Sequence, residues 1–190
     1  ASRAATIVKR IAALRRADPA FGGEVHVLPD FHGNRSPLGR PEALGAISGM
    51  TLDGSFDGLC KLYWRSCVAI ALGVRHILEH MKERGIAVTH LHIAGGHTRN
   101  PLLMQLYADA TGVDLVEHDT EDCVLLGTAM TAASALSAED DLVAVCTAMG
   151  RPERIRKADP DDSAARHRDY AVFVLMHRQQ AELRSLAGMH

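Results

Sequence analysis

The stretch most suited to chemistry is a pair of glycines, Gly95 and Gly96, between a short apolar segment and a helical pattern. Residues 90–93 (HLHI) predict a strand, and residues 101–111 place leucines and a tyrosine on one face of a predicted helix. Glycines at a strand-to-helix turn let a ligand approach bare backbone, and the N–H groups of the following helix point towards it. A nucleotide phosphate or ribose fits such a turn, although a tight turn that only needs positive φ explains the pair as well.

A second candidate is a short histidine motif on the long helix predicted upstream. His76, Glu79 and His80 match H-x-x-E-H, in which two histidines one helical turn apart can bind zinc. The same residues can also be ordinary surface or half-buried helix positions, because a five-residue pattern arises by chance in a chain with 11 histidines. We keep a zinc hydrolase as an alternative and assign no metal site.

A third candidate is the loop predicted over residues 29–41, which is rich in glycine, proline and asparagine. Asp30 and His32 could form a catalytic pair, but a loop aspartate more often accepts a turn-stabilising hydrogen bond. Asn34 and Arg35 could contact a substrate or phosphate, or could simply anchor the loop. Both alternatives stay open for this pair.

Composition limits the class of protein. The chain has 190 residues, 47% of them hydrophobic, and a formal net charge of −2, which is ordinary for a soluble globular protein and gives no electrostatic basis for binding nucleic acid. No run approaches the roughly 20 apolar residues of a membrane span. Four cysteines without a C-x-x-C pair, and no recognisable secretory signal, predict free thiols in a cytoplasmic protein. A homodimer stays an open alternative.

The apolar periodicity predicts helices alternating with strands. Helices are expected over residues 3–16, 56–84 (capped by Ser55), 101–111, 124–137 and 170–186, and strands over 24–28, 46–52, 90–93 and 113–117. The long second helix should bury a stripe of six residues, Tyr63, Cys67, Ile70, Val74, Ile77 and Met81. Residues 138–162 are charged and are expected on the surface. This order predicts a layered α/β domain with ligand sites at the carboxyl ends of its strands.

In this order the chain resembles the C-terminal half of FGGY-type carbohydrate kinases. The resembling stretches are DFHGNRSP (30–37), GAISGMTL (45–52), the long helix over 63–79, GGHTRNPL (95–102) with Gln105 and Asp109, and LGTA (126–129). The first stretch and the RNP sequence at 99–101 are most similar to the ribulokinase-like, pentulose kinase branch.

The resemblance implies one half of an actin-like ATPase fold of the ribonuclease H-like kind, with a mixed sheet flanked by helices. ATP or ADP would lie in a cleft between two domains, with Mg²⁺ accompanying the ATP. Gly95 and Gly96 would approach the adenosine and α-phosphate, Asn100 would direct its amide to the base or ribose, and His97 would line the same pocket.

We expect residues 1–190 to be a single domain, comprising most of a C-terminal nucleotide-binding domain. The N-terminal domain, which carries the sugar pocket and the catalytic aspartate in this family, has no counterpart, so no catalytic residue is assigned. The intact protein would phosphorylate a hydroxyl of a ketopentose such as ribulose, or of a related polyol, and the isolated chain would be inactive. The alternative from another class is a non-catalytic nucleotide-binding module.

Overall fold

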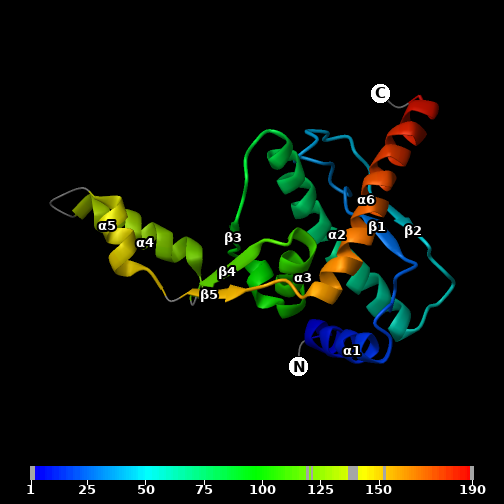
Figure 1. Cartoon of the computed structure of the whole chain (residues 1–190), viewed down its shortest axis with the longest axis horizontal. Helices are drawn as coiled ribbons and strands as arrows, with labels where there is room; N and C mark the ends of the chain where they lie inside the picture. Colours follow the sequence, from blue (N-terminus) through cyan, green and yellow to red (C-terminus); the bar gives the residue numbers. More distant parts are fainter. Residues whose placement is uncertain (1–2, 119, 121, 137–140, 152, 189–190) are drawn as a thin grey trace.

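The computed structural model describes residues 3–118, 120, 122–136, 141–151 and 153–188 (Figure 1). Its elements are α1 (Arg3–Ala17), β1 (His26–Leu28), β2 (Ala46–Ser48), α2 (Phe56–Glu83), β3 (His90–His92), the 3₁₀ turn η1 (Gly96–Arg99), α3 (Pro101–Thr111), β4 (Asp114–His118), α4 (Cys123–Leu136), α5 (Leu142–Met149), β5 (Glu153–Arg156) and α6 (Pro160–Leu186). β1 and β2 form an antiparallel pair, and β3, β4 and β5 form a mixed sheet in that order. The expected α/β class with a mixed sheet is therefore confirmed.

The core surrounds the long helix α2, against which α1, α3 and α6 pack (Figure 1). Each of these helices contributes at least one fully enclosed side chain: Ile11, Trp64, Leu106 and Phe173. Leu115 of β4 closes the core from the sheet side and has no exposed surface. The sheet is therefore joined to the helical core through β4, against which α3 packs.

The two ends of α2 form as predicted. The Ser55 hydroxyl accepts a hydrogen bond from the backbone N–H of Gly58 at 3.1 Å, which satisfies one of the free donors of the first turn. At the other end Gly85 has φ = +79°, the left-handed conformation in which glycine ends helices at least cost.

The predicted buried stripe of α2 is wrong in most of its members. Ile70 is 37% exposed, whereas Cys67 is buried as expected. The other four residues of the stripe are only partly buried: Tyr63, Val74, Ile77 and Met81. The apolar side chains that α2 buries best are Cys60, Trp64, Val68, Ala71 and Leu72. The buried face of α2 is thus rotated from the predicted stripe. It includes the charged Arg65, which a search for apolar periodicity assigns to the exposed face.

Arg65 is buried because α6 and the segment that enters β1 supply partners for its guanidinium group. Its terminal nitrogens donate to the two carboxylate oxygens of Asp169 at 3.1 and 2.6 Å, and its Nε donates to the carbonyl of Val25 at 2.5 Å. Arg166 also pairs with Asp169, at 2.9 Å, and its guanidinium lies over the ring of Trp64. This cluster joins three segments that are far apart in the sequence.

The described residues of 141–162 are exposed or partly exposed, as expected for a surface segment, but two elements that the sequence did not predict lie within it and a third begins there. Residues 138–140, with residue 137 at the predicted end of the preceding helix, lie outside the described residues. α5 follows Asp141, whose carboxylate accepts the N–H groups of Val143 and Ala144 at 2.9 and 3.1 Å. β5 forms the sheet edge although three of its four residues are charged, a composition that gives no apolar alternation. The last helix begins at Pro160, well before the predicted residue 170.

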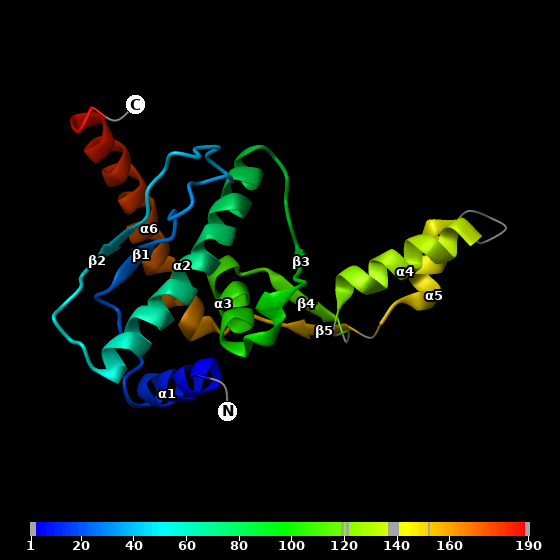
Figure 2. The same ribbon diagram turned by 180° about the vertical axis from the view of Figure 1, so that it is seen from behind.

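α4 and α5 project from the sheet as a pair of helices, away from the core (Figures 1 and 2). They leave apolar side chains in solvent, with Val124, Leu125 and Val143 each about 70% exposed. Within the described part of the chain, no helix combines the length and apolar character needed to cross a bilayer.

Candidate functional site

The predicted strand, glycine turn and helix are present, with a 3₁₀ turn between strand and helix that the sequence did not predict. Gly95 has φ = +84°, which explains why this position is glycine. A Cβ built on either Gly95 or Gly96 meets no atom within 4 Å, so the backbone at both residues borders open space. The Thr98 hydroxyl and N–H both donate to the carbonyl of Gly95, at 2.8 and 3.1 Å, and hold the turn closed.

Asn100 links this turn to α3 and α2. Its side-chain oxygen accepts the N–H groups of Leu102 and Leu103 at 3.2 and 3.4 Å, which makes it the N-cap of α3. Its amide nitrogen donates to the hydroxyl of Tyr63 at 3.2 Å. The N–H groups at the start of α3, which the sequence predicted to face a ligand, are therefore partly taken by this cap.

His97 is positioned by Tyr107 of α3. The two rings lie 6.0 Å apart at 24°, and the Tyr107 hydroxyl shares a hydrogen bond of 2.7 Å with His97 Nδ1. Burial raises the pKa of Tyr107 to about 12, so its hydroxyl stays protonated over the working range of pH. The exposed imidazole is thus held beside the glycines, with Nε2 directed to partners other than Tyr107.

Gln105 and Asp109 position the segment that enters α6. Asp109 is 2% exposed, and burial raises the pKa of its carboxyl group. It accepts the N–H of Asp159 at 2.8 Å and the amide of Gln105 at 2.8 Å, and Gln105 also accepts from Arg156 at 3.2 Å. These two residues, which the sequence singled out only by resemblance, connect α3 to β5 and α6.

The loop over residues 29–41 lies apart from this turn and packs beside α6. The Asn34 amide donates to Asp30 at 3.0 Å, and its side-chain oxygen accepts the N–H of Leu38 at 3.2 Å. The backbones of Asn34 and Arg40 also pair in both directions, so Asn34 anchors the loop. Arg35 is exposed.

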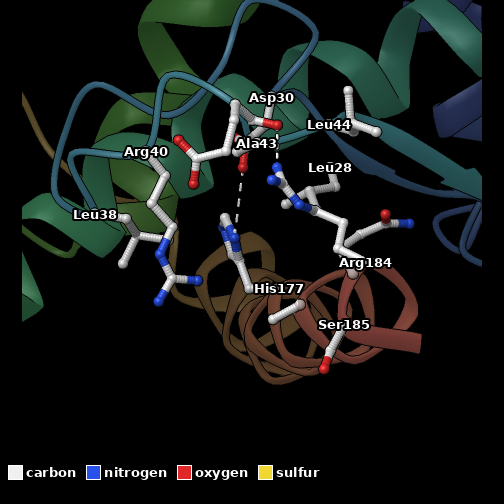
Figure 3. Close-up of a pocket in the computed structure, with 12 residues that line it drawn as sticks. Leu28, Asp30, Leu38, Arg40, Ala43, Leu44, His177, Arg184 and Ser185 are labelled. Carbon is white, nitrogen blue, oxygen red and sulfur yellow. Dashed lines mark hydrogen bonds and ion pairs between the residues drawn. The ribbon is translucent and has the colours of Figure 1, made fainter. Parts of the chain in front are cut away.

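Asp30 accepts a turn-stabilising hydrogen bond, but from Asn34, while His32 is exposed. The other carboxylate oxygen of Asp30 lies 3.5 Å from Nδ1 of His177 on α6. The Asp30–His177 contact borders a cavity of about 250 Å³, into which Arg40 also projects (Figure 3). Burial raises the pKa of Asp30 and lowers that of His177, so both groups are driven towards their neutral forms. None of the residues of the glycine turn lines this cavity.

The H-x-x-E-H residues take part in helix packing. His76 Nδ1 lies 2.9 Å from the Tyr170 hydroxyl, and burial lowers the pKa of this histidine to about 4. His80 Nδ1 bonds the His76 carbonyl at 2.9 Å, and Glu79 pairs with a neighbouring arginine of the same helix. Within the described residues, their ligand atoms do not converge with a third group at metal-binding distances. These contacts favour the structural interpretation over zinc.

The arrangement at residues 95–100 therefore offers exposed backbone, an oriented imidazole and a fixed amide to a ligand. Of the residues singled out in the sequence, it brings together Gly95, Gly96, His97 and Asn100. Asn34 and Arg35 belong to the separate loop beside α6.

Comparison with known proteins gives relatives over most of the chain. A ribulokinase from Mycolicibacterium smegmatis is 34% identical over 164 residues, covering 85% of this chain and 28% of that protein. An FGGY carbohydrate kinase domain-containing protein from Xenopus laevis is 36% identical over 171 residues, covering 88% of this chain and 30% of the relative. The chain thus spans about 30% of the length of such curated relatives.

Solved structures show the same fold at lower identity. A xylulose kinase from Rhodospirillum rubrum superposes with a TM-score of 0.70 at 23% identity, covering 92% of this chain and 34% of that one. A Plasmodium falciparum glycerol kinase, solved with ADP, gives 0.63 at 19% identity, covering 89% of this chain and 33% of that one. These neighbours confirm the expected actin-like ATPase half.

The sequence model of the family "FGGY family of carbohydrate kinases, C-terminal domain" matches residues 2–136. This range includes the loop over 29–41, the glycine turn and α3. That match covers well over half of the chain and agrees with the relatives and with the fold. The chain belongs to the FGGY family of carbohydrate kinases.

Proposed function

We propose that this chain is the nucleotide-binding part of an ATP-dependent sugar kinase, with Gly95, Gly96, His97 and Asn100 in contact with the nucleotide. The observation that carries the proposal is the open space above the two glycines, where even a Cβ would meet no atom within 4 Å. A ligand can therefore lie directly on the backbone there. A glycerol kinase of the same fold was solved with ADP, which supports a nucleotide as that ligand.

For the acceptor we propose a ketopentose such as ribulose, or a related polyol. The M. smegmatis ribulokinase, 34% identical, supports this choice. We propose the exposed Arg35 as a contact to substrate or phosphate, and Asn34 as the residue that holds the loop in place.

ATP would supply the phosphoryl group, and Mg²⁺ would arrive bound to its phosphates; none of these residues is assigned to the ion. The residues of the turn bind and orient. The glycine backbone accommodates the nucleotide without steric conflict, Tyr107 directs the His97 imidazole, and Asn100 presents an amide whose orientation is fixed by the α3 cap. Positioning is the main contribution a protein makes to phosphoryl transfer, so these are the functions expected of a nucleotide site.

The experiment is calorimetric titration of the 190-residue chain with ADP. We expect a dissociation constant on the order of 0.1–1 mM, because only one wall of a cleft is present. Gly96→Val should weaken binding by about tenfold or more, since its branched side chain occupies the space of the ligand. The free energy of unfolding of this variant should change by less than about 0.5 kcal/mol, because a Cβ at residue 96 meets no protein atom within 4 Å.

The matched control is Gly54→Val, which makes the same change at another glycine with open space, in the segment before α2. This variant should bind ADP like the unmodified chain. Equal affinities for the Gly96 variant and the unmodified chain, or equal losses in both variants, would contradict the proposed site.

A further inference from the structure

Three ligand-bearing side chains meet on one face of the mixed sheet: His92 on β3, His118 on β4 and Glu153 on β5. The strand register brings them together. His118 and Glu153 are directly paired across β4 and β5, and His92 pairs with Val116, two residues before His118 on the same face. The group therefore follows from the pairing of three strands, one of which is not apparent in the sequence.

The distances between these side chains are short. His92 Nδ1 lies 2.9 Å from His118 Nε2, and the two rings are stacked at 5.1 Å with 22° between their planes. One ligand atom from each of the three residues lies within 4.8 Å of the other two. His118 faces His92 with Nε2 and Glu153 with Nδ1, so one of its two nitrogens would bind an ion and the side chains would rotate to bring the three ligand atoms around it.

The carboxylate of Glu153 is only loosely held. Its nearest ion-pair contact, to His118 Nδ1, is 3.6 Å, which is too long for a hydrogen bond. The two arginines of β5, Arg154 and Arg156, pair instead with Glu117, which lies on the opposite face of the sheet. Glu153 and His92 are exposed and His118 is half-buried, so an ion can reach all three from solvent.

We propose that His92, His118 and Glu153 bind one divalent transition-metal ion of the zinc class. Zinc–nitrogen bonds of about 2.0–2.1 Å at tetrahedral angles separate two ligand nitrogens by roughly 3.3 Å. The histidine nitrogens need to move apart by only about 0.4 Å to reach that spacing. A small rotation of the exposed His92 side chain supplies such a movement.

The ligand types select the metal. Imidazole nitrogen suits zinc, copper and nickel, whereas Mg²⁺ takes oxygen ligands and keeps much of its water. This site is therefore chemically distinct from any magnesium that accompanies a nucleotide. Three protein ligands also leave a fourth position for water or for a further ligand.

His92 lies three residues before Gly95, so a bound ion would fix the strand end that leads into the glycine turn.

The test is calorimetric titration of the 190-residue chain with zinc chloride, together with the visible absorption of the Co²⁺ form, which reports coordination. We expect one ion per chain. Loss of a residue that merely orients a metal ligand costs about 10–100-fold in affinity, so His92→Ala and Glu153→Gln should each weaken binding by at least that factor. Both side chains are exposed, and neither substitution should change the melting temperature of the metal-free protein.

His90→Ala is the matched control, because it removes another exposed histidine of the same strand that contacts Thr89 and lies outside the group. It should bind zinc like the unmodified chain and give the same Co²⁺ spectrum. Absence of saturable binding would overturn the proposal and leave a hydrogen-bonded histidine pair. Binding that is lost equally in the His90 variant would also overturn it, since the histidines would then act non-specifically.

Discussion

The side chain of Asn100 serves both the fold and the proposed nucleotide site. Its oxygen caps α3, and its amide nitrogen donates one of two hydrogens to Tyr63. The cap requires only an acceptor, whereas the proposed contact to a base or ribose requires the amide. Substitutions that keep one function and remove the other can therefore separate them.

We predict that Asn100→Ala lowers the free energy of unfolding by about 1 kcal/mol, because the cap is lost. Asn100→Ser keeps a hydroxyl acceptor at the N-cap and should stay within about 0.5 kcal/mol of the unmodified chain. Both variants should bind ADP more weakly. Urea denaturation and ADP titration measure the two quantities, and an Asn100→Ser variant with unchanged ADP affinity would restrict this residue to its structural function.

At the level of single residues, the sequence predicted the glycine turn but not every contact that its residues make. The glycine pair was recognisable because no other residue suits the position of Gly95. The capping role of Asn100 also had a signal, since asparagine directly before proline is typical of a helix start. The His92–His118–Glu153 group had none, because it depends on strand register and on β5, which lacks apolar alternation.

Among the elements, α2 and α6 are joined by a buried charge cluster. The side chains of Arg65 and Asp169 are 3% and 10% exposed, and Arg166 shares the same carboxylate. Removing one member of a buried pair leaves the other charge without compensation in a low-dielectric environment. Surface pairs behave differently, because water already solvates both partners.

We predict that Asp169→Ala destabilises the protein by about 3–5 kcal/mol, since it leaves two buried guanidinium groups without their carboxylate. The control is Asp57→Ala, which removes an equally close partner from Arg10 at an exposed site, 39% and 46% exposed respectively. That change should cost much less stability, because water solvates both partners of the exposed pair. Urea unfolding compares the two, and equal losses would show that burial does not determine the importance of the pair.

The bounds of α1 and α2 were predictable, because Asp18 and Pro19 follow the end of α1 and because Ser55 and Gly85 mark the two ends of α2. The apolar periodicity of α2 did not locate its buried face. α6 was placed too late, because its first three turns are mostly charged and their burial depends on partners on α2. Its start nevertheless carries clear signals in Asp159 as N-cap, Pro160 at the first position and acidic residues in the first turn.

For the whole molecule, the length of the chain relative to its relatives is decisive. It spans about 30% of the length of the curated relatives reported above. We propose that the sugar pocket and the catalytic aspartate lie in another domain. Base, sugar and phosphate must be held together for transfer. The proposed nucleotide site alone would supply only one of these functions.

We predict that the 190-residue chain binds ADP but does not phosphorylate ribulose, as measured in a coupled assay that detects ADP release in the presence of ATP and Mg²⁺. The same chain with a protein that carries the sugar-binding domain is the reference for activity. Robust turnover by the chain alone would contradict this expectation, and the catalytic base would then be sought among Asp30, Asp53 and Asp57.

The position of α6 has a consequence for how this protein is made. The family match ends at residue 136, yet Phe173 and Met176 of α6 are 3% and 6% exposed within the core, and Arg166 covers Trp64. A nascent chain that has reached Leu136 has made α1, α2 and α3 without the helix that covers them. Since domains fold as units during synthesis, these surfaces stay open to chaperones until the last helix has left the ribosome.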